Sequence, residues 1–88
     1  MAKILTDQLH LDSVKSTYGD SEDLQVYHNS ADSYIESYTG NLTFRQRQDD
    51  GDISFESDDG SGGTTQYFRV DGGSTMNVFS KPTWYGDG

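Results

Sequence analysis

Carboxylates are the side chains with the clearest potential for chemistry, and several gather in glycine-containing turns. They are Asp49, Asp50, Asp52, Asp58 and Asp59. Oxygen ligands in a loop can bind calcium. The spacing does not fit a twelve-residue EF-hand loop, because Gly51 separates Asp50 from Asp52 and no glutamate closes the loop. We therefore predict solvated turn carboxylates, with no metal site and no cofactor.

Histidines and nucleophiles offer little support for catalysis. His10 and His28 stand apart in the chain without the paired spacing of a zinc site. There is no cysteine, and no Gly-x-Ser-x-Gly motif that would mark an activated serine. Glu36 and Glu56 could form a carboxylate pair for glycoside cleavage, but any acidic β-protein offers such a pair. We predict that the chain is not an enzyme.

Aromatic side chains could stack on sugar rings. The candidates are Tyr27, Tyr38, Tyr67, Trp84 and Tyr85. Aromatic residues also commonly fill the faces of β-sheets, where they pack against their cross-strand neighbours. We favour this packing role and keep glycan binding as the alternative.

The elements that must position these residues are strands. Between residues 49 and 79, apolar residues alternate with polar ones in three short runs, which contain Ile53 and Phe55, Phe68 and Val70, and Met76 and Val78. Alternation turns one side of an extended chain toward a core and the other toward water. Turns rich in aspartate, glycine and serine separate the runs. The pattern predicts an all-β fold.

The first half of the chain reads similarly. A short extended segment is predicted around Leu9 and Leu11, and a turn over 16–23. Residues 24–28 and 34–38 flank a polar break and are typical of a β-hairpin. Residues 42–47 form the clearest alternating run, with Leu42 and Phe44 on one side. Further strands are predicted over 53–56, 64–70 and 75–79, which together favour a meander or stacked hairpins.

Composition limits both the core and the partners. Leucine, isoleucine, valine and phenylalanine total 16 of 88 residues, and the formal charge is −9. So few apolar residues make a weak core for one chain, and without cysteine the usual remaining support is a partner subunit. The chain has six lysines and arginines against 15 aspartates and glutamates, which argues against binding to nucleic acid or to anionic membranes. No apolar run is long enough for membrane insertion or a signal peptide.

The two ends of the chain echo each other. Leu9 and Leu11, followed by Tyr18-Gly19-Asp20, match Met76 and Val78, followed by Tyr85-Gly86-Asp87, at an offset of 67 residues. The echo predicts one repeat plus the opening of the next.

Several ordered motifs resemble a known family. The segments concerned are 20–29 (DSEDLQVYHN), 32–35, 40–43, 50–53, 57–63 and 67–72. Together they resemble a module in structural and tail-fibre proteins of bacteriophages, over residues 18–81. The sequence departs from the family at 28–32, where such modules usually carry an Asp-Gly pair, and at the unusually polar 46–48.

This resemblance implies an elongated, intertwined homotrimeric fibre, with a shaft like a β-prism or a triple β-helix. The inward residues expected to share the trimer core are Leu24, Val26, Leu42, Phe44, Ile53, Phe55, Phe68 and Val70. Residues 1–15 are expected to be a strand or lead-in from a preceding module, and 16–81 the β-repeat module. Residues 82–88 are expected to begin a next repeat or form a C-terminal tail.

The expected function is structural. The resemblance implies a trimeric β-shaft in the virion, within a tail fibre or other appendage, that supports host attachment and contacts other virion proteins. The main alternative is a module that binds a glycan on the host surface. A polysaccharide depolymerase fragment and a capsid decoration protein are less favoured alternatives.

Overall fold

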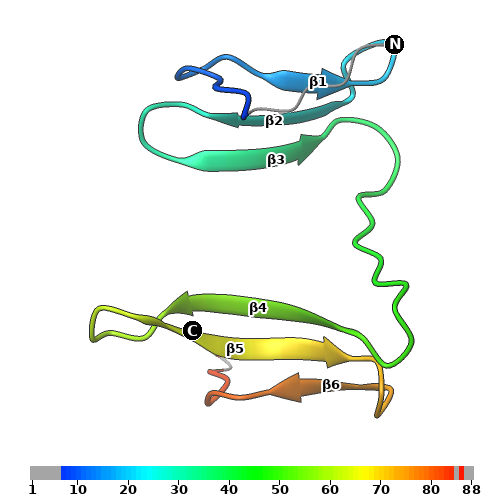
Figure 1. Ribbon diagram of the computed structural model, residues 1–88, viewed down its shortest axis with the longest axis vertical. Coiled ribbons are helices and arrows are strands. Elements are labelled where there is room, and N and C mark those ends of the chain that lie inside the picture. The colour runs from blue at the N-terminus through cyan, green and yellow to red at the C-terminus, as the bar shows by residue number, and fades with distance from the viewer. Residues whose placement is uncertain (1–6, 85, 87–88) are drawn as a thin grey trace. The chain divides into compact units, whose positions relative to one another are not determined.

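The chain folds into two small antiparallel sheets, each in its own compact unit. A computed structural model describes residues 7–84 and 86, and within them there are six strands and no helix. One unit ends at Thr43 and the other begins at Phe44. Each sheet has three strands in sequence order, which is a meander (Figure 1). The predicted all-β class with short antiparallel strands is confirmed.

The first sheet contains β1 (Ser16–Tyr18), β2 (Leu24–His28) and β3 (Ser33–Ser37). The hairpin predicted from the two runs around the polar break is confirmed, and β2 has the predicted bounds. The prediction of a turn over 16–23 was wrong in its first part, because β1 pairs with β2 there. Only one of its three residues is a large apolar one, so β1 carries too little alternation to be detected.

Two hydrogen bonds to the Asn29 side chain hold the β2–β3 turn. The Asn29 carboxamide oxygen accepts hydrogen bonds from the backbone N–H of Ala31 at 3.1 Å and of Asp32 at 2.8 Å. Ser30 takes a left-handed conformation with φ of 80°. Asparagine holds such turns well because its short side chain can mimic a backbone acceptor. The departure at 28–32 is therefore compatible with a tight hairpin.

The second sheet contains β4 (Asp52–Asp58), β5 (Thr64–Asp71) and β6 (Met76–Phe79). These confirm the strands predicted over 53–56, 64–70 and 75–79, with ends that differ by one or two residues. The β4–β5 ladder contains a β-bulge: Phe55 pairs with Phe68, whereas the next residue pairs with Gln66. Tyr67 is therefore an extra residue on β5.

One of the turn carboxylates accepts hydrogen bonds from the backbone of its own turn. Asp59 accepts hydrogen bonds at one oxygen from the backbone N–H of Ser61 at 2.7 Å and of Gly63 at 3.1 Å. These two bonds lower the pKa of Asp59, because they favour the charged carboxylate. The turn that contains Gly51 and the turn that contains Gly72 contact each other closely. A Cβ on Gly72 would clash with the Gly51 carbonyl oxygen, so this position needs glycine.

The strand predicted over 42–47 is wrong. Residues 41–47 carry no strand and run from β3 to β4 (Figure 1). Alternation defines two sides of an extended segment, but a strand also needs a backbone partner, and none of the described strands pairs here. The polar segment 46–48 instead leads into a turn over 48–51, which a hydrogen bond from the Gly51 N–H to the Gln48 carbonyl closes at 2.8 Å. Gln46 donates from Nε2 to the Asp52 carbonyl at 3.2 Å and accepts at Oε1 from the Gln48 N–H at 2.9 Å.

The N-terminal prediction and the chain ends have a mixed outcome. No strand includes Leu9 or Leu11, so the short strand signal there was wrong; both side chains are exposed. The first six residues of the predicted 1–15 lead-in lie outside the described residues, as do Tyr85 and Asp87 of the echo and Gly88. The predicted division into 1–15, 16–81 and 82–88 stays a prediction.

No side chain among the described residues is buried. Each sheet leaves large apolar side chains in water, including Ile35 at 55% exposure and Phe68 at 38%. Globular domains normally bury such residues in a core of their own. No described helix is long and apolar enough to cross a membrane.

Candidate functional site

The second sheet has one uncharged apolar face, called here the phenylalanine face. Its apolar members are Ile53, Phe55, Phe68, Val70 and Phe79, which the register places side by side on neighbouring strands. Asn77, which is aligned with Val70, lies on the same side. Phe55 and Phe68 stack with ring centroids 4.6 Å apart and an interplanar angle of 13°. Phe79 continues the row at 5.6 Å from Phe68. The row spans all three strands and is still largely open to solvent on its outer side.

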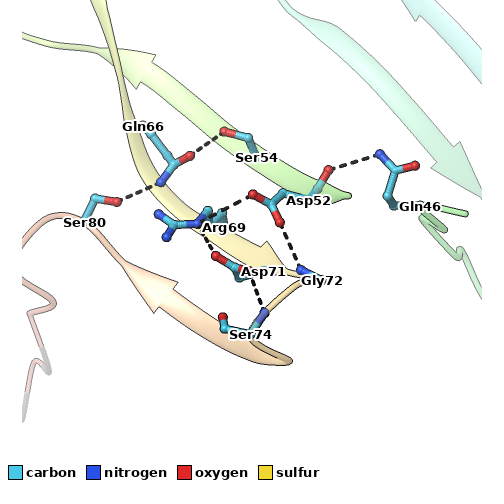
Figure 2. Close-up of polar contacts among 9 residues, drawn as sticks. All are labelled: Gln46, Asp52, Ser54, Gln66, Arg69, Asp71, Gly72, Ser74 and Ser80. Carbon is cyan, nitrogen blue, oxygen red and sulfur yellow. Dashed lines mark hydrogen bonds and ion pairs between the residues drawn. The ribbon is translucent and has the colours of Figure 1, made fainter. Parts of the chain in front are cut away.

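The opposite face of this sheet is polar, and its groups satisfy one another (Figure 2). Arg69 Nε donates to Asp71 Oδ2 at 2.9 Å and lies 3.8 Å from Asp52 Oδ2. The other Asp52 oxygen accepts from the Gly72 N–H at 3.0 Å. Bonds from the Ser74 backbone and from Arg69 lower the pKa of Asp71 to about 2. Arg69 thus joins two carboxylates of this face, Asp52 and Asp71.

A second chain of hydrogen bonds extends the polar face along β5. Ser54 Oγ donates to Gln66 Oε1 at 2.9 Å, and Gln66 Nε2 donates to Ser80 Oγ at 2.9 Å (Figure 2). The Gln66 amide in β5 thereby links Ser54 in β4 to Ser80, which directly follows β6.

The first sheet also has an aliphatic face. The register aligns Ser16, Val26 and Ile35 across the three strands, and Tyr18 with Leu24 in the next row. Val26 and Ile35 are 40% and 55% exposed. Like those of the phenylalanine face, the apolar side chains Val26 and Ile35 are not covered by any other part of the described chain.

The other side of the first sheet, called here the tyrosine face, is formed by Lys15, Gln25, Tyr27, Tyr34, Glu36 and Tyr38. The Tyr27 and Tyr34 rings stack at 5.1 Å. Both Tyr27 and Tyr38 donate their hydroxyl groups to Glu36 Oε1 at 3.0 Å. Desolvation and this bond raise the pKa of Tyr27, and the same carboxylate raises the pKa of Tyr38.

A hollow of about 510 Å³ lies at the turn end of the β2–β3 hairpin. It is lined by Val26, Tyr27, His28, Ser33, Tyr34 and Ile35. Nδ1 of His28 lies 3.0 Å from Ser33 Oγ, within hydrogen-bond distance. No group of three or more potential metal ligands occurs among residues 7–84 and 86.

The residues predicted for the trimer core fall into three groups. Ile53, Phe55, Phe68 and Val70 lie together on the phenylalanine face. Leu24 and Val26 share the aliphatic face of the first sheet. Leu42 and Phe44 lie outside any strand, at 45% and 59% exposure. Their place in a trimer interior stays a prediction.

The candidate glycan and carboxylate residues are scattered, with one exception. Tyr27 and Tyr38 meet at Glu36, whereas Tyr67 donates its hydroxyl to the Asp58 carbonyl at 2.6 Å in the other unit. Trp84 is 87% exposed, and Tyr85 lies outside the described residues.

The carboxylates proposed as a catalytic pair belong to different sheets. Glu36 lies in β3 and Glu56 in β4, where Glu56 lies 3.5 Å from the Thr64 hydroxyl.

Sequence reasoning missed three contributors to these faces. Phe79 belongs to the phenylalanine row, but it is out of phase with Met76 and Val78, the alternating apolar residues of its run, so alternation pointed to the opposite side of β6. Ile35 belongs to the aliphatic face, and its place within the run predicted over 34–38 was an available signal. The role of Lys15 had no such signal, because it depends on the pairing of β1 with β2.

Comparison of the chain with protein-family models, with curated proteins and with solved structures finds no match in any of the three. The resemblance to the bacteriophage tail-fibre module stays a prediction.

Proposed function

We propose that this chain is a structural module of a phage tail fibre or other virion appendage, whose copies assemble into a homotrimeric β-shaft. The observation that carries the proposal is the absence of any buried side chain among the described residues, although each sheet has an apolar face. Burial of apolar surface is the main force that holds protein chains together. A neighbouring copy would supply the missing half of the core.

Charge supports the phenylalanine face as the place where copies meet. The protein carries a net charge of −9, so most of its surface repels another copy. The phenylalanine face has no charged member, and the nearby ionic groups of Asp52, Arg69 and Asp71 lie on the opposite side of the sheet. Contact through the uncharged face buries aromatic rings and leaves the charges in solvent.

The role that follows is mechanical and involves no catalysis. Three chains that share a thin apolar interior form a stiff rod with a charged, hydrogen-bonded exterior. Such a rod spaces or presents a host-binding part of the particle and contacts other virion proteins. The motifs over residues 18–81 that resemble tail-fibre modules favour a trimer over other assemblies.

Light scattering on the purified chain tests the proposal. The expected mass is three times the 9.8 kDa of one chain. Thermal unfolding should depend on protein concentration, because dissociation accompanies the loss of structure. A compact monomer that melts cooperatively at a temperature independent of concentration would contradict the proposal, since one chain would then form its core alone.

A further inference from the structure

The tyrosine face already holds one ammonium group. Lys15 Nζ lies 4.7 Å from the centroid of the Tyr27 ring, within the range of a cation–π interaction. The same ammonium donates to Gln25 Oε1 at 2.9 Å. Tyr27 of β2 also stacks on Tyr34 of the neighbouring strand β3. The arrangement is a row of one cation and two rings across the sheet.

The surroundings of these rings favour cations over other ligands. All three tyrosines of the face direct their hydroxyl hydrogens to carboxylates: Tyr27 and Tyr38 to Glu36, and Tyr34 to Asp32 at 3.4 Å. A phenol that donates to a carboxylate has a more electron-rich ring, which strengthens its attraction for a cation. The hydroxyl donors are therefore engaged, and the groups that this face presents to a ligand are aromatic rings and carboxylate oxygens.

We propose that the tyrosine face is a binding site for organic ammonium ions, in which Lys15 acts as the internal ligand of the Tyr27 ring. The ligand class is a small alkylammonium such as choline, whose methyl groups pack on aromatic rings while its charge faces Glu36. The half-buried rings of Tyr27 and Tyr34 supply the contact surface. Lys15 must leave the ring before another cation can take its position.

Saturation-transfer NMR on the full chain tests this site, with choline chloride as the probe and sodium chloride at equal ionic strength as the reference. The method detects weak binding and is most sensitive for slowly tumbling assemblies, such as the proposed trimer. Lys15→Ala should strengthen choline binding about two- to fivefold, the effect of removing a competing cation from an exposed ring. Lys81→Ala is the matched control, because it changes the net charge equally at an exposed site outside the tyrosine face.

A second variant separates the site from general attraction to an acidic protein. Adding Tyr27→Leu to Lys15→Ala should remove the gain, while far-UV circular dichroism confirms that the sheets persist. Equal binding by the Lys15 and Lys81 variants would overturn the proposal, as would a gain that survives in the folded double variant. The absence of any choline signal from Lys15→Ala would overturn it as well, and would show that Lys15 only braces β1 against β2.

Discussion

Phe68→Ala is the most informative substitution, because Phe68 is the central ring of the phenylalanine row. It contacts Phe55 on one side and Phe79 on the other, whereas each of those has one ring neighbour in the row. Each aromatic pair contributes about 0.5–1.5 kcal/mol beyond the area it buries. Loss of both pairs should destabilise the sheet by about 1–3 kcal/mol, and Phe55→Ala or Phe79→Ala by about half as much.

The assembly should lose more than the sheet does. Phe68 is 38% exposed in the single chain. For a phenylalanine of about 200 Å², that fraction is roughly 75 Å², worth about 2 kcal/mol when a neighbouring copy covers it. Three copies would lose about 6 kcal/mol, which corresponds to roughly a 10⁴-fold weaker association constant.

Sedimentation equilibrium across a range of concentrations measures this change directly. Met76→Ala is the control, because Met76 is also a large exposed side chain but is aligned with Asp71 on the other face. The control should retain the association of the parent chain. If Phe68→Ala assembled as tightly as the parent while Met76→Ala dissociated, the phenylalanine face would not be the contact between copies.

Three further predictions follow from the turns and the exposed aromatics. The pKa of Asp71 is about 2 in the folded chain, below its ordinary 3.8, so the stability it contributes is complete above about pH 4 and lost as pH falls toward 2. Asp71→Asn should flatten the acid limb of denaturant-measured stability over that window, and an unchanged limb would contradict the assigned shift. Gly72→Ala should lower the melting temperature, because its Cβ meets the Gly51 carbonyl oxygen; an unchanged value would show that the turn adapts freely. On glycan arrays, Trp84→Ala should leave the profile of the parent chain unaltered, and loss of a specific signal in this variant or in Tyr38→Ala would favour the glycan-binding alternative.

The alternation of residue types predicted much of the fold. β2, β4 and β5 carry apolar residues at alternate positions, which identified both the strand and its apolar side. In β6 the alternating Met76 and Val78 align with Asp71 and Arg69, so the pattern identified the strand but not the side that joins the phenylalanine row. The run at 42–47 also alternates and is not a strand. Alternation is local, whereas pairing depends on a partner elsewhere in the chain, so the pattern alone does not distinguish the two cases.

The candidate sites were less predictable, because they depend on register. The phenylalanine row requires that Phe55, Phe68 and Phe79 face one another across three strands. The meeting of Tyr27 and Tyr38 at Glu36 also needs the β2–β3 pairing. Types and spacings showed that these residues could contribute to a face, but not which neighbours each would have.

The bulge at Tyr67 changes which residues of β5 project to each side of the sheet. In an uninterrupted strand, Gln66 would project to the same side as Phe68, placing an amide among the rings. Past the insertion it projects to the side of Ser54 instead, where it bonds to Ser54 and Ser80. The extra residue thus keeps the Gln66 amide out of the phenylalanine row and places it among the hydrogen bonds of the polar face.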